Sequence, residues 1–330
     1  MRKSWLAAAL CTFVLGVVVP QTAHATATNG GTDWAQTGGY TTDPKATAQF
    51  RDLGAHITLT LAPGESHYIN SVLSVGSAST KTEVSQVAGC WLVGGAAETL
   101  GNALGISEAG TNVDAGASVT LTSRFEFSPT APGTYDCSLH AVFINHESPT
   151  ASGHIYVLSG SMIQDAKGPL IAHAQAYQPA RVLLNSTTPS ADINSIASYT
   201  VPAGISSIDV ISDLAVTNCY AGSSTTEDPY YLCPTSGESA TASSTLTSQL
   251  FVQQLDLLGN VCHTTVDSLL GSTVTVDTHH QKLYHRLDGV PIDPTCGSLN
   301  VKVFARVTKT GGNDIQIENT NQSYSFLFEA

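Results

Sequence analysis

The 330-residue sequence is poor in charged side chains, and especially in basic ones. Lysine and arginine together number 13 against 26 acidic residues, which gives a formal net charge of −13, and charged residues make up only 12% of the chain. Nucleic acids and anionic membranes both favour a basic surface, so this balance argues against either as a partner. The remaining polarity comes largely from serine, threonine, asparagine and glycine, as in many secreted β proteins.

The sequence also lacks an apolar run long enough to span a membrane. The run at residues 5–19 covers about 15 positions, whereas a spanning helix needs roughly 20. Two basic residues precede this run, and the small-x-small sequence Ala23-His24-Ala25 follows it, which is the pattern of a secretory signal peptide. We therefore expect cleavage after residues 1–25, or after Ala27, and an acidic, secreted, extracellular protein with no membrane span.

Familiar catalytic motifs are missing as well. There is no G-x-S-x-G, no H-E-x-x-H and no glycine-rich phosphate loop that opens onto a helix. Residues 64–67, Gly-Glu-Ser-His, place a serine beside a histidine and an acid, but the members of a triad must converge from different elements. We expect no catalytic or cofactor-binding residue and no cofactor, and we take the protein to be non-enzymatic.

The cysteines are too widely spaced to form a zinc site. Six remain after the expected cleavage, and no two are closer than 14 positions, so C-x-x-C pairs are absent. An even number of cysteines in an exported chain favours disulfides instead. The six are Cys90, Cys137, Cys219, Cys233, Cys262 and Cys296.

A histidine cluster at residues 279–285 is the strongest candidate for a metal site. On a strand His279 and His280 would point to opposite faces, whereas His279 and His285 would share a face about 20 Å apart at roughly 3.3 Å per residue. A metal ion would therefore need ligands from another strand. We interpret the three histidines as outward polar residues of an exposed strand and predict no metal ligand.

Alternating patterns, by contrast, are abundant, and the clearest lies at residues 116–143. Before a Pro/Gly corner one face carries Val119, Leu121, Phe125 and Phe127, and the other Thr120, Thr122, Arg124 and Glu126. After the corner Tyr135, Cys137, Leu139, Ala141 and Phe143 face inward, and Asp136, Ser138 and His140 outward. This period of two predicts two half-buried strands of an antiparallel sheet.

The pattern recurs, more weakly, at residues 271–304, within a longer internal repeat. The strand–turn–strand sequence at residues 58–75 corresponds to residues 198–216, Cys90 to Cys219, and Cys137 to Cys296. Between the first cysteine and the next Gly-x-x-Val strand the second copy has 51 residues where the first has 25. A tandem duplication with one enlarged copy is the simplest explanation.

We therefore predict an all-β protein made of two tandem antiparallel β-sandwiches. The expected parts are a signal peptide (1–25), a flexible arm (26–46), the first sandwich (47–160), a junction (161–195) with a short helix at 171–177, and the second sandwich (196–330) with an insertion at 220–270.

The stretch Pro132-Gly133-Thr134-Tyr135-Asp136-Cys137 resembles the strand F corner of immunoglobulin-like domains. In that family the tyrosine bonds back to the chain and the cysteine bridges the two sheets, which implies an Ig-like sandwich and a bond from Cys137 to Cys90. The sequence departs from the family in two ways. No tryptophan lies a dozen residues after Cys90, since Trp91 is adjacent instead, and Pro294 stands where the second copy should have its tyrosine.

The repeat extends the disulfide prediction to the second copy. If the two copies match, Cys219 pairs with Cys296 and Cys233 with Cys262. The alternative is pairing of nearest neighbours, Cys219 with Cys233 and Cys262 with Cys296, which would join loops and not sheets. If a disulfide lies within one sandwich, its loss should destabilise that sandwich and leave the other nearly unchanged.

Our leading functional hypothesis is a secreted, non-enzymatic binding or structural module whose partner is an extracellular protein, a glycan or another copy. One alternative is a secreted hydrolase or metal-dependent enzyme on a β scaffold. Another is a subunit of an extracellular fibre or coat, in which the arm and the strand at residues 322–328 extend a neighbour's sheet. A further possibility is a covalent cross-link from Lys302 to Asn319 or Asn321, as in some bacterial surface sandwiches.

Overall fold

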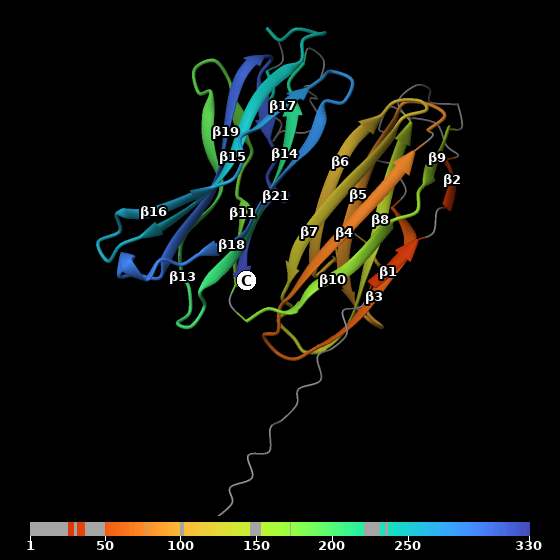
Figure 1. Cartoon of the computed structure of the whole chain (residues 1–330). Helices are drawn as coiled ribbons and strands as arrows, with labels where there is room; N and C mark the ends of the chain where they lie inside the picture. The colour runs from red at the N-terminus through yellow and green to blue at the C-terminus, as the bar shows by residue number, and fades with distance from the viewer. Residues whose placement is uncertain are drawn as a thin grey trace, which may run out of the picture.

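The fold is all-β, as expected. The computed structural model (Figure 1) describes residues 26–29, 32–36, 50–76, 78–99, 102–145, 153–171, 173–220, 232–234 and 237–330. The expected signal peptide lies outside these ranges. No helix within the described residues has the length and apolar character needed to cross a membrane.

The first half of the chain forms two antiparallel sheets from ten strands. These are β1 (Thr26–Asn29), β2 (Thr32–Gln36), β3 (Arg51–Leu61), β4 (His67–Gly76), β5 (Thr82–Leu92), β6 (Gly105–Val113), β7 (Ser118–Phe127), β8 (Gly133–Asn145), β9 (Gly153–Val157) and β10 (Ser161–Pro169). Sheet A has the order β1-β10-β4-β9-β2, with β7 also paired to β4, and sheet B has the order β3-β8-β5-β6.

The second half forms two more sheets. Its strands are β11 (His173–Gln178), β12 (Val182–Leu184), β13 (Ser190–Thr200), β14 (Ser207–Asn218), β15 (Ser244–Leu255), β16 (Val261–Val266), β17 (Leu270–Val274), β18 (His280–Pro291), β19 (Asn300–Gly312), β20 (Ile315–Ile317) and β21 (Thr320–Glu329). Sheet C has the order β11-β21-β14-β20-β12, with β18 on β14, and sheet D the order β13-β19-β15-β16, with β17 on β15.

The two halves repeat one topology, which agrees with the predicted duplication. Each strand of sheets A and B has a counterpart at the same place in sheets C and D, and β17 is the addition. The predicted residue-by-residue match between the two copies was partly wrong. Cys90 lies on β5, whose counterpart β15 has no cysteine, and Cys219 follows β14 instead. Residues 220–270 are likewise not a simple insertion, because β15 and β16 match β5 and β6.

Two segments expected to be irregular contain strands. In the predicted flexible arm, β1 pairs with β10 and β2 with β9, so both strands extend the chain's own sheet A. Residues 161–195 hold β10 to β12 and the start of β13, and the helix predicted at residues 171–177 is wrong because β11 lies there, paired with β21. Its residues alternate in a short run, where strand and helix patterns are hard to distinguish.

The alternation at residues 116–143 is confirmed, but its two strands belong to different sheets. β7 pairs with β4 in sheet A, whereas β8 lies between β3 and β5 in sheet B. The Pro/Gly corner therefore crosses the core and does not form a hairpin. The inward residues predicted on β8 are at most 1% exposed, and Ser138 and His140, expected outside, are buried as well.

The outer faces of sheets A and C are packed against each other, so the sheets lie in the order B, A, C, D. Ile211, Phe326 and Phe328 of sheet C belong to the same hydrophobic cluster as the core of the first half. Strand β14 is consequently buried on both faces, and all its residues but the first are buried. The halves are thus joined by a buried interface and not by a linker alone.

Candidate functional site

The described residues form three disulfides, of which one follows the predicted pairing. Cys90 is bonded to Cys137, as expected. The pairing of Cys219 with Cys296 and Cys233 with Cys262 is wrong, because Cys219 is bonded to Cys233 and Cys262 to Cys296. The nearest-neighbour alternative holds because neither Cys219 nor Cys296 lies on the counterpart of a cysteine-bearing strand.

The Cys90–Cys137 bond lies within sheet B. The two residues are directly opposite each other on β5 and β8, with their Cα atoms 4.0 Å apart, so the bond does not bridge two sheets as the immunoglobulin resemblance implied. The Tyr135 hydroxyl does donate back to the carbonyl of Ala131, at 2.6 Å. The assignment to Ig-like domains stays a prediction.

His285 is not an outward residue, since it is 2% exposed and bonded to a serine and an aspartate. Its Nε2 lies 2.8 Å from Ser248 Oγ on β15, and its Nδ1 lies 2.6 Å from Asp267 Oδ2 after β16. This is the connectivity of a serine-hydrolase triad. Asp267 is itself held in place because it accepts a hydrogen bond of 2.7 Å from the amide of Leu250.

The Ser248–His285–Asp267 triad is nevertheless closed to substrate. Ser248 is only 1% exposed and lies in the interior between sheets C and D. The three residues are absent from the linings of the cavities of about 120, 360 and 530 Å³ in the described part of the chain. A nucleophile must reach the reacting carbon at about 3 Å, so we interpret this triad as a buried polar link between two sheets.

An open groove on sheet B holds a second histidine between two carboxylates. His56 Nδ1 lies 2.8 Å from Asp136 and its Nε2 lies 3.1 Å from Asp52, beside a groove of about 530 Å³. Burial alone would lower the His56 pKa, but the hydrogen bond and charge of Asp136, with Asp52, raise it. Both ring nitrogens are therefore occupied, and the groove's described lining contains no serine or cysteine nucleophile.

The other candidates are not brought together. His279 and His280 have ring centroids 4.0 Å apart, but no group of three or more metal-ligating side chains exists among the described residues. Lys302 lies on the outer face of sheet D, 4.8 Å above the Phe304 ring. Asn319 lies instead in the connection from β20 to β21 of sheet C. The side chain of Asn321 is outside the described residues.

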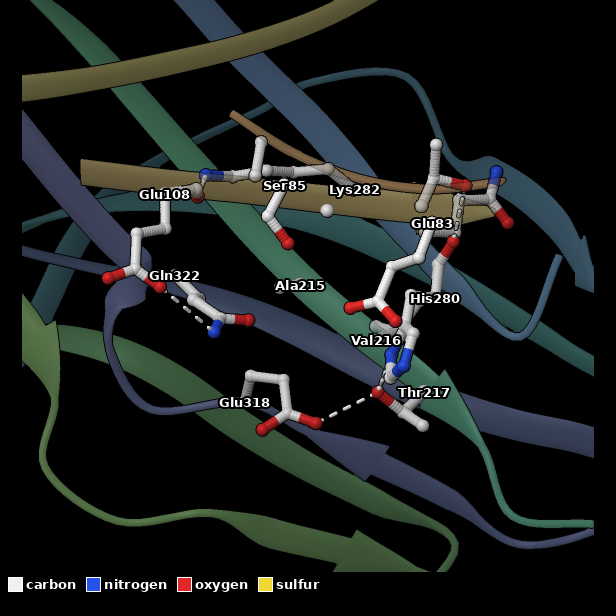
Figure 2. A pocket seen from close by; sticks show the side chains of 14 residues that line it. Glu83, Ser85, Glu108, Ala215, Val216, Thr217, His280, Lys282, Glu318 and Gln322 are labelled. Carbon is white, nitrogen blue, oxygen red and sulfur yellow. Dashed lines mark hydrogen bonds between the residues drawn. The ribbon is translucent and has the colours of Figure 1, made fainter. Parts of the chain in front are cut away.

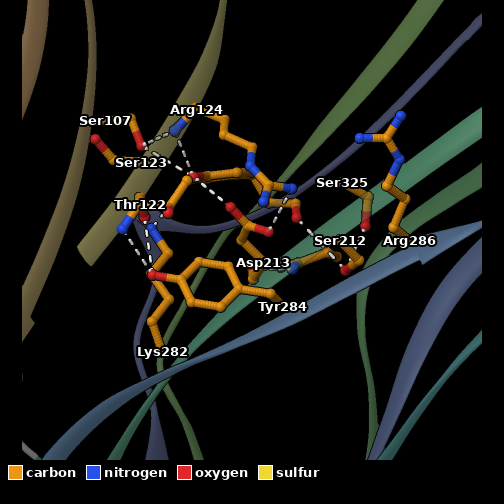
Figure 3. Close-up of polar contacts among 12 residues, drawn as sticks. Ser107, Thr122, Ser123, Arg124, Ser212, Asp213, Lys282, Tyr284, Arg286 and Ser325 are labelled. Carbon is orange, nitrogen blue, oxygen red and sulfur yellow. Dashed lines mark hydrogen bonds and ion pairs between the residues drawn. The ribbon is translucent and has the colours of Figure 1, made fainter. Parts of the chain in front are cut away.

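The interface between the halves contains a buried polar cluster around the Tyr324 hydroxyl. This hydroxyl donates to Asp213 Oδ2 at 2.9 Å and accepts from the Arg124 amide at 2.8 Å. Figure 3 shows Arg124, Asp213 and Lys282 of this cluster. Ser107 Oγ contributes a further bond of 3.1 Å. Asp213 is completely buried, and its Oδ1 lies 3.4 Å from Arg124 Nη1 of the other half. The outward face predicted for β7 is therefore an interface.

Lys282 brings a second positive charge into this interface. Its Nζ donates to the carbonyl of Glu108 at 2.7 Å and to the Tyr324 hydroxyl at 3.2 Å. Burial lowers the Lys282 pKa to about 8, although the charge of Asp213 acts in the opposite direction. Figure 2 shows this lysine at a small cavity of about 120 Å³, where Glu108 is bonded to Gln322 and Glu318 to Thr217.

Stability should rise with pH between about 8 and 10. The unfolded chain keeps the Lys282 proton up to its ordinary pKa of 10.5, whereas the folded chain releases it near 8, so the unfolded state binds more protons in this window. Above pH 10 the trend should reverse, because burial raises the Tyr284 pKa to about 12 and only the unfolded state ionises.

Urea unfolding at pH 7.5, 8.5 and 9.5 measures how the free energy of unfolding changes with pH. Lys282→Met should remove the rise, and Lys302→Met, on the outer face of sheet D, should preserve it. A rise of equal size in Lys282→Met would show that another group is responsible.

The most exposed apolar part of the described chain is a projecting arm at residues 256–270. Six of the eleven large hydrophobic side chains that are exposed lie there: Leu257, Leu258, Val261, Val266, Leu269 and Leu270. Asp256 Oδ1 accepts from the amides of Leu258 and Asn260, both at 2.8 Å, which fixes the turn with Leu258 87% exposed. Figure 1 shows the β16 hairpin extending from the body.

This arm is anchored by a disulfide and by hydrogen bonds, although it adds little to the core. The Cys262–Cys296 bond ties β16 to the connection between β18 and β19. The Gln254 amide makes three hydrogen bonds of 2.8 Å to the backbone of the same connection, to Asp293 and Ser298. The arm was not predicted from the sequence, although two Leu-Leu pairs beside turn residues were a signal for it.

No protein-family model matches the chain, and no curated protein matches it by sequence. Among solved structures it is similar to a chain of the T13 IBDV viral particle, at 11% identity and a TM-score of 0.30 over 93% of this chain and 68% of that one. The spike protein P1 from bacteriophage PM2 has 11% identity and a TM-score of 0.23 over 92% and 97% of the chains. The CBM22-1–CBM22-2 tandem domain from Paenibacillus barcinonensis Xyn10C has 9% identity and a TM-score of 0.23 over 92% and 97%. TM-scores this low establish neither a shared family nor a shared function.

Proposed function

We propose that the protein is a secreted, non-enzymatic structural module that associates with a second copy through the edge formed by β16. The observation that carries this proposal is the concentration of exposed apolar side chains on a disulfide-anchored arm. Monomeric proteins rarely expose a large contiguous apolar patch, and those that do usually use it for binding. Three disulfides support an oxidising, extracellular location.

The edge itself favours pairing with another strand. β16 is the last strand of sheet D, and five of its six residues are exposed. Its sequence, Val-Cys-His-Thr-Thr-Val, contains no proline, lysine or acid, which are the residues that usually protect an edge strand. An unprotected edge offers unpaired backbone groups to an added strand, and strand addition is a common mode of recognition.

A second copy of the chain can supply the strand that is added to this edge. Antiparallel pairing of β16 with itself across a two-fold axis would bring identical apolar side chains together, as isologous dimers do. The chain has a net charge of −13, so two copies repel each other over most of their surfaces. An uncharged contact region is where that repulsion is smallest, and added salt should strengthen the association.

The earlier idea that the ends of the chain extend a neighbour's sheet has less support. β21, which contains residues 322–328, is already paired with β11 on one side and β14 on the other. In the flexible N-terminal arm predicted at residues 26–46, β1 and β2 are paired within sheet A. The enzyme alternative is disfavoured in turn by the burial of Ser248 and by the occupied His56 ring.

Sedimentation equilibrium of the mature chain should reveal a dimer whose population grows with protein concentration and with salt. Leu258→Asp in the arm and Val266→Lys on the edge should each shift the protein to monomer. Ile171→Asp is the matched control, because Ile171 is 86% exposed and Leu258 is 87% exposed, and it should leave the equilibrium unchanged. A monomer at all concentrations, or equal dimerisation in Val266→Lys, would contradict the proposal.

A further inference from the structure

A second opening between the halves is lined by cations. This pocket, of about 360 Å³, lies between the outer faces of sheets A and C, within the volume range of about 300–1,000 Å³ found for small-molecule sites. Its lining includes Arg124 of β7, Lys167 of β10 and Arg286 of β18, and contains no aspartate or glutamate. Because the whole chain has only 13 lysines and arginines, three in one pocket is a marked concentration.

Each cation has an acidic neighbour outside the lining, and each keeps donors for a ligand. Arg286 contacts Asp288 through Nε, at 2.6 Å, so its two terminal nitrogens are not used by that bond. Figure 3 shows this guanidinium turned away from Ser212 and Ser325. Lys167 Nζ donates to Asp209 at 2.9 Å, which uses one of its three hydrogens.

Arg124 is the least exposed of the three cations. Its Nη1 is buried and makes no aligned hydrogen bond in the described part of the chain, although Asp213 Oδ1 lies 3.4 Å away. The ion pair with Asp213 engages this one terminal nitrogen, and the guanidinium still adds its positive charge to the pocket lining. Together the three cations can surround a carboxylate or sulfate group, for which arginine geometry is well suited.

The rest of the pocket suits a ring that carries hydroxyl groups. Asn70 Oδ1, which belongs to the lining, is buried and accepts no hydrogen bond among the described residues, so it is ready for a hydroxyl donor. Gln164 and Thr122 add polar groups. Tyr68 and Phe328, with ring centroids 5.2 Å apart, provide an apolar aromatic wall.

We propose that this pocket binds an acidic saccharide through the carboxylate or sulfate of one sugar unit. The acid group would lie among Arg124, Lys167 and Arg286, and the ring hydroxyls would bond Asn70 and Gln164. Such a ligand uses the cations, the unpartnered acceptor and the aromatic wall together, whereas a bare anion uses only the first. The inference is independent of the β16 contact.

Calorimetric titration of the mature chain tests the proposal with trigalacturonate, glucose 6-sulfate, neutral glucose and inorganic sulfate. We expect both acidic sugars to bind, more weakly as salt is added, and neutral glucose and inorganic sulfate to bind at least about tenfold more weakly, which corresponds to about 1.4 kcal/mol. Arg286→Gln and Lys167→Gln should each weaken acidic-sugar binding by a similar factor.

Arg306→Gln is the control, because Arg306 is an exposed arginine paired with Asp192 on sheet D, and it should bind as the unaltered chain does. Unchanged melting temperatures would confirm that the variants are folded. No binding of either acidic sugar, or undiminished binding in Arg286→Gln, would overturn the proposal. Equal affinity for inorganic sulfate and the acidic sugars would mean an adventitious ion only and would also overturn it.

Discussion

Asp213→Ala is expected to lower the free energy of unfolding by about 3–5 kcal/mol, the usual range when one partner of a buried ion pair is removed. Asp213 is completely buried and accepts the Tyr324 hydroxyl bond at 2.9 Å. Without it, Arg124 would lose its buried carboxylate partner, and Lys282 would keep only Glu108 as an acidic neighbour. Chemical denaturation at pH 7 gives the change directly.

Two control variants show whether the loss of stability in Asp213→Ala comes from an unpaired buried charge or from substitution of an aspartate in general. Asp192→Ala removes a similar pair with Arg306, but that pair is exposed, so the loss should be at most about 1 kcal/mol. In Asp213→Leu combined with Arg124→Met, most of the loss should be recovered because no unpaired charge is left from this pair. If Asp213→Ala and Asp192→Ala proved equally mild, the interface would not depend on its buried charge.

Replacement of both Cys90 and Cys137 by alanine is expected to destabilise the protein by about 4 kcal/mol, from the chain entropy of a loop of 47 residues. Removal of the Cys219–Cys233 bond, which closes 14 residues, should have a smaller effect of about 3 kcal/mol. Both bonds are mostly buried, so the cysteine pairs are reasonably matched. Scanning calorimetry of the two variants tests whether loss of the Cys90–Cys137 bond is the more destabilising.

The sequence alone predicts that loss of this bond affects only the first half. The structure changes that expectation, since the core cluster of the first half includes Tyr324, Phe326 and Phe328 from the second. We expect the Cys90→Ala/Cys137→Ala variant to unfold in one transition at a lower temperature. Two transitions, the upper one unchanged, would mean that the halves are stabilised separately.

Local alternation predicted the strands well. The inward faces of β7 and β8 follow directly from residues such as Phe125 and Leu139, because every second side chain of a strand lies on one face. The duplication was also visible, since the strand–turn–strand unit at residues 58–75 recurs at residues 198–216. The immunoglobulin resemblance implied the bond between Cys90 and Cys137, which the structure contains, although it lies within one sheet and does not bridge two.

Features that depend on distant contacts could not be predicted. The face of β7 with Thr122 and Arg124 looks like a solvent face, and only its packing against β18 and β21 makes it an interface. The Ser248–His285–Asp267 triad unites three separate segments, so no local spacing reveals it. The pairing in the second half failed because the assumed match of Cys219 with Cys90 ignored an offset of one strand.

Amide hydrogen exchange measured at several protein concentrations tests most directly whether β16 is the contact between two copies. We predict that amides of residues 261–266 exchange more slowly as the concentration rises, while those of exposed turns such as residues 93–96 do not change. In Val266→Lys those amides of residues 261–266 that point away from β15 should exchange rapidly at every concentration, because only the pairing of β16 with β15 remains. Exchange of residues 261–266 that is independent of concentration, in a sample that sedimentation shows to be dimeric, would contradict the claim and place the contact elsewhere.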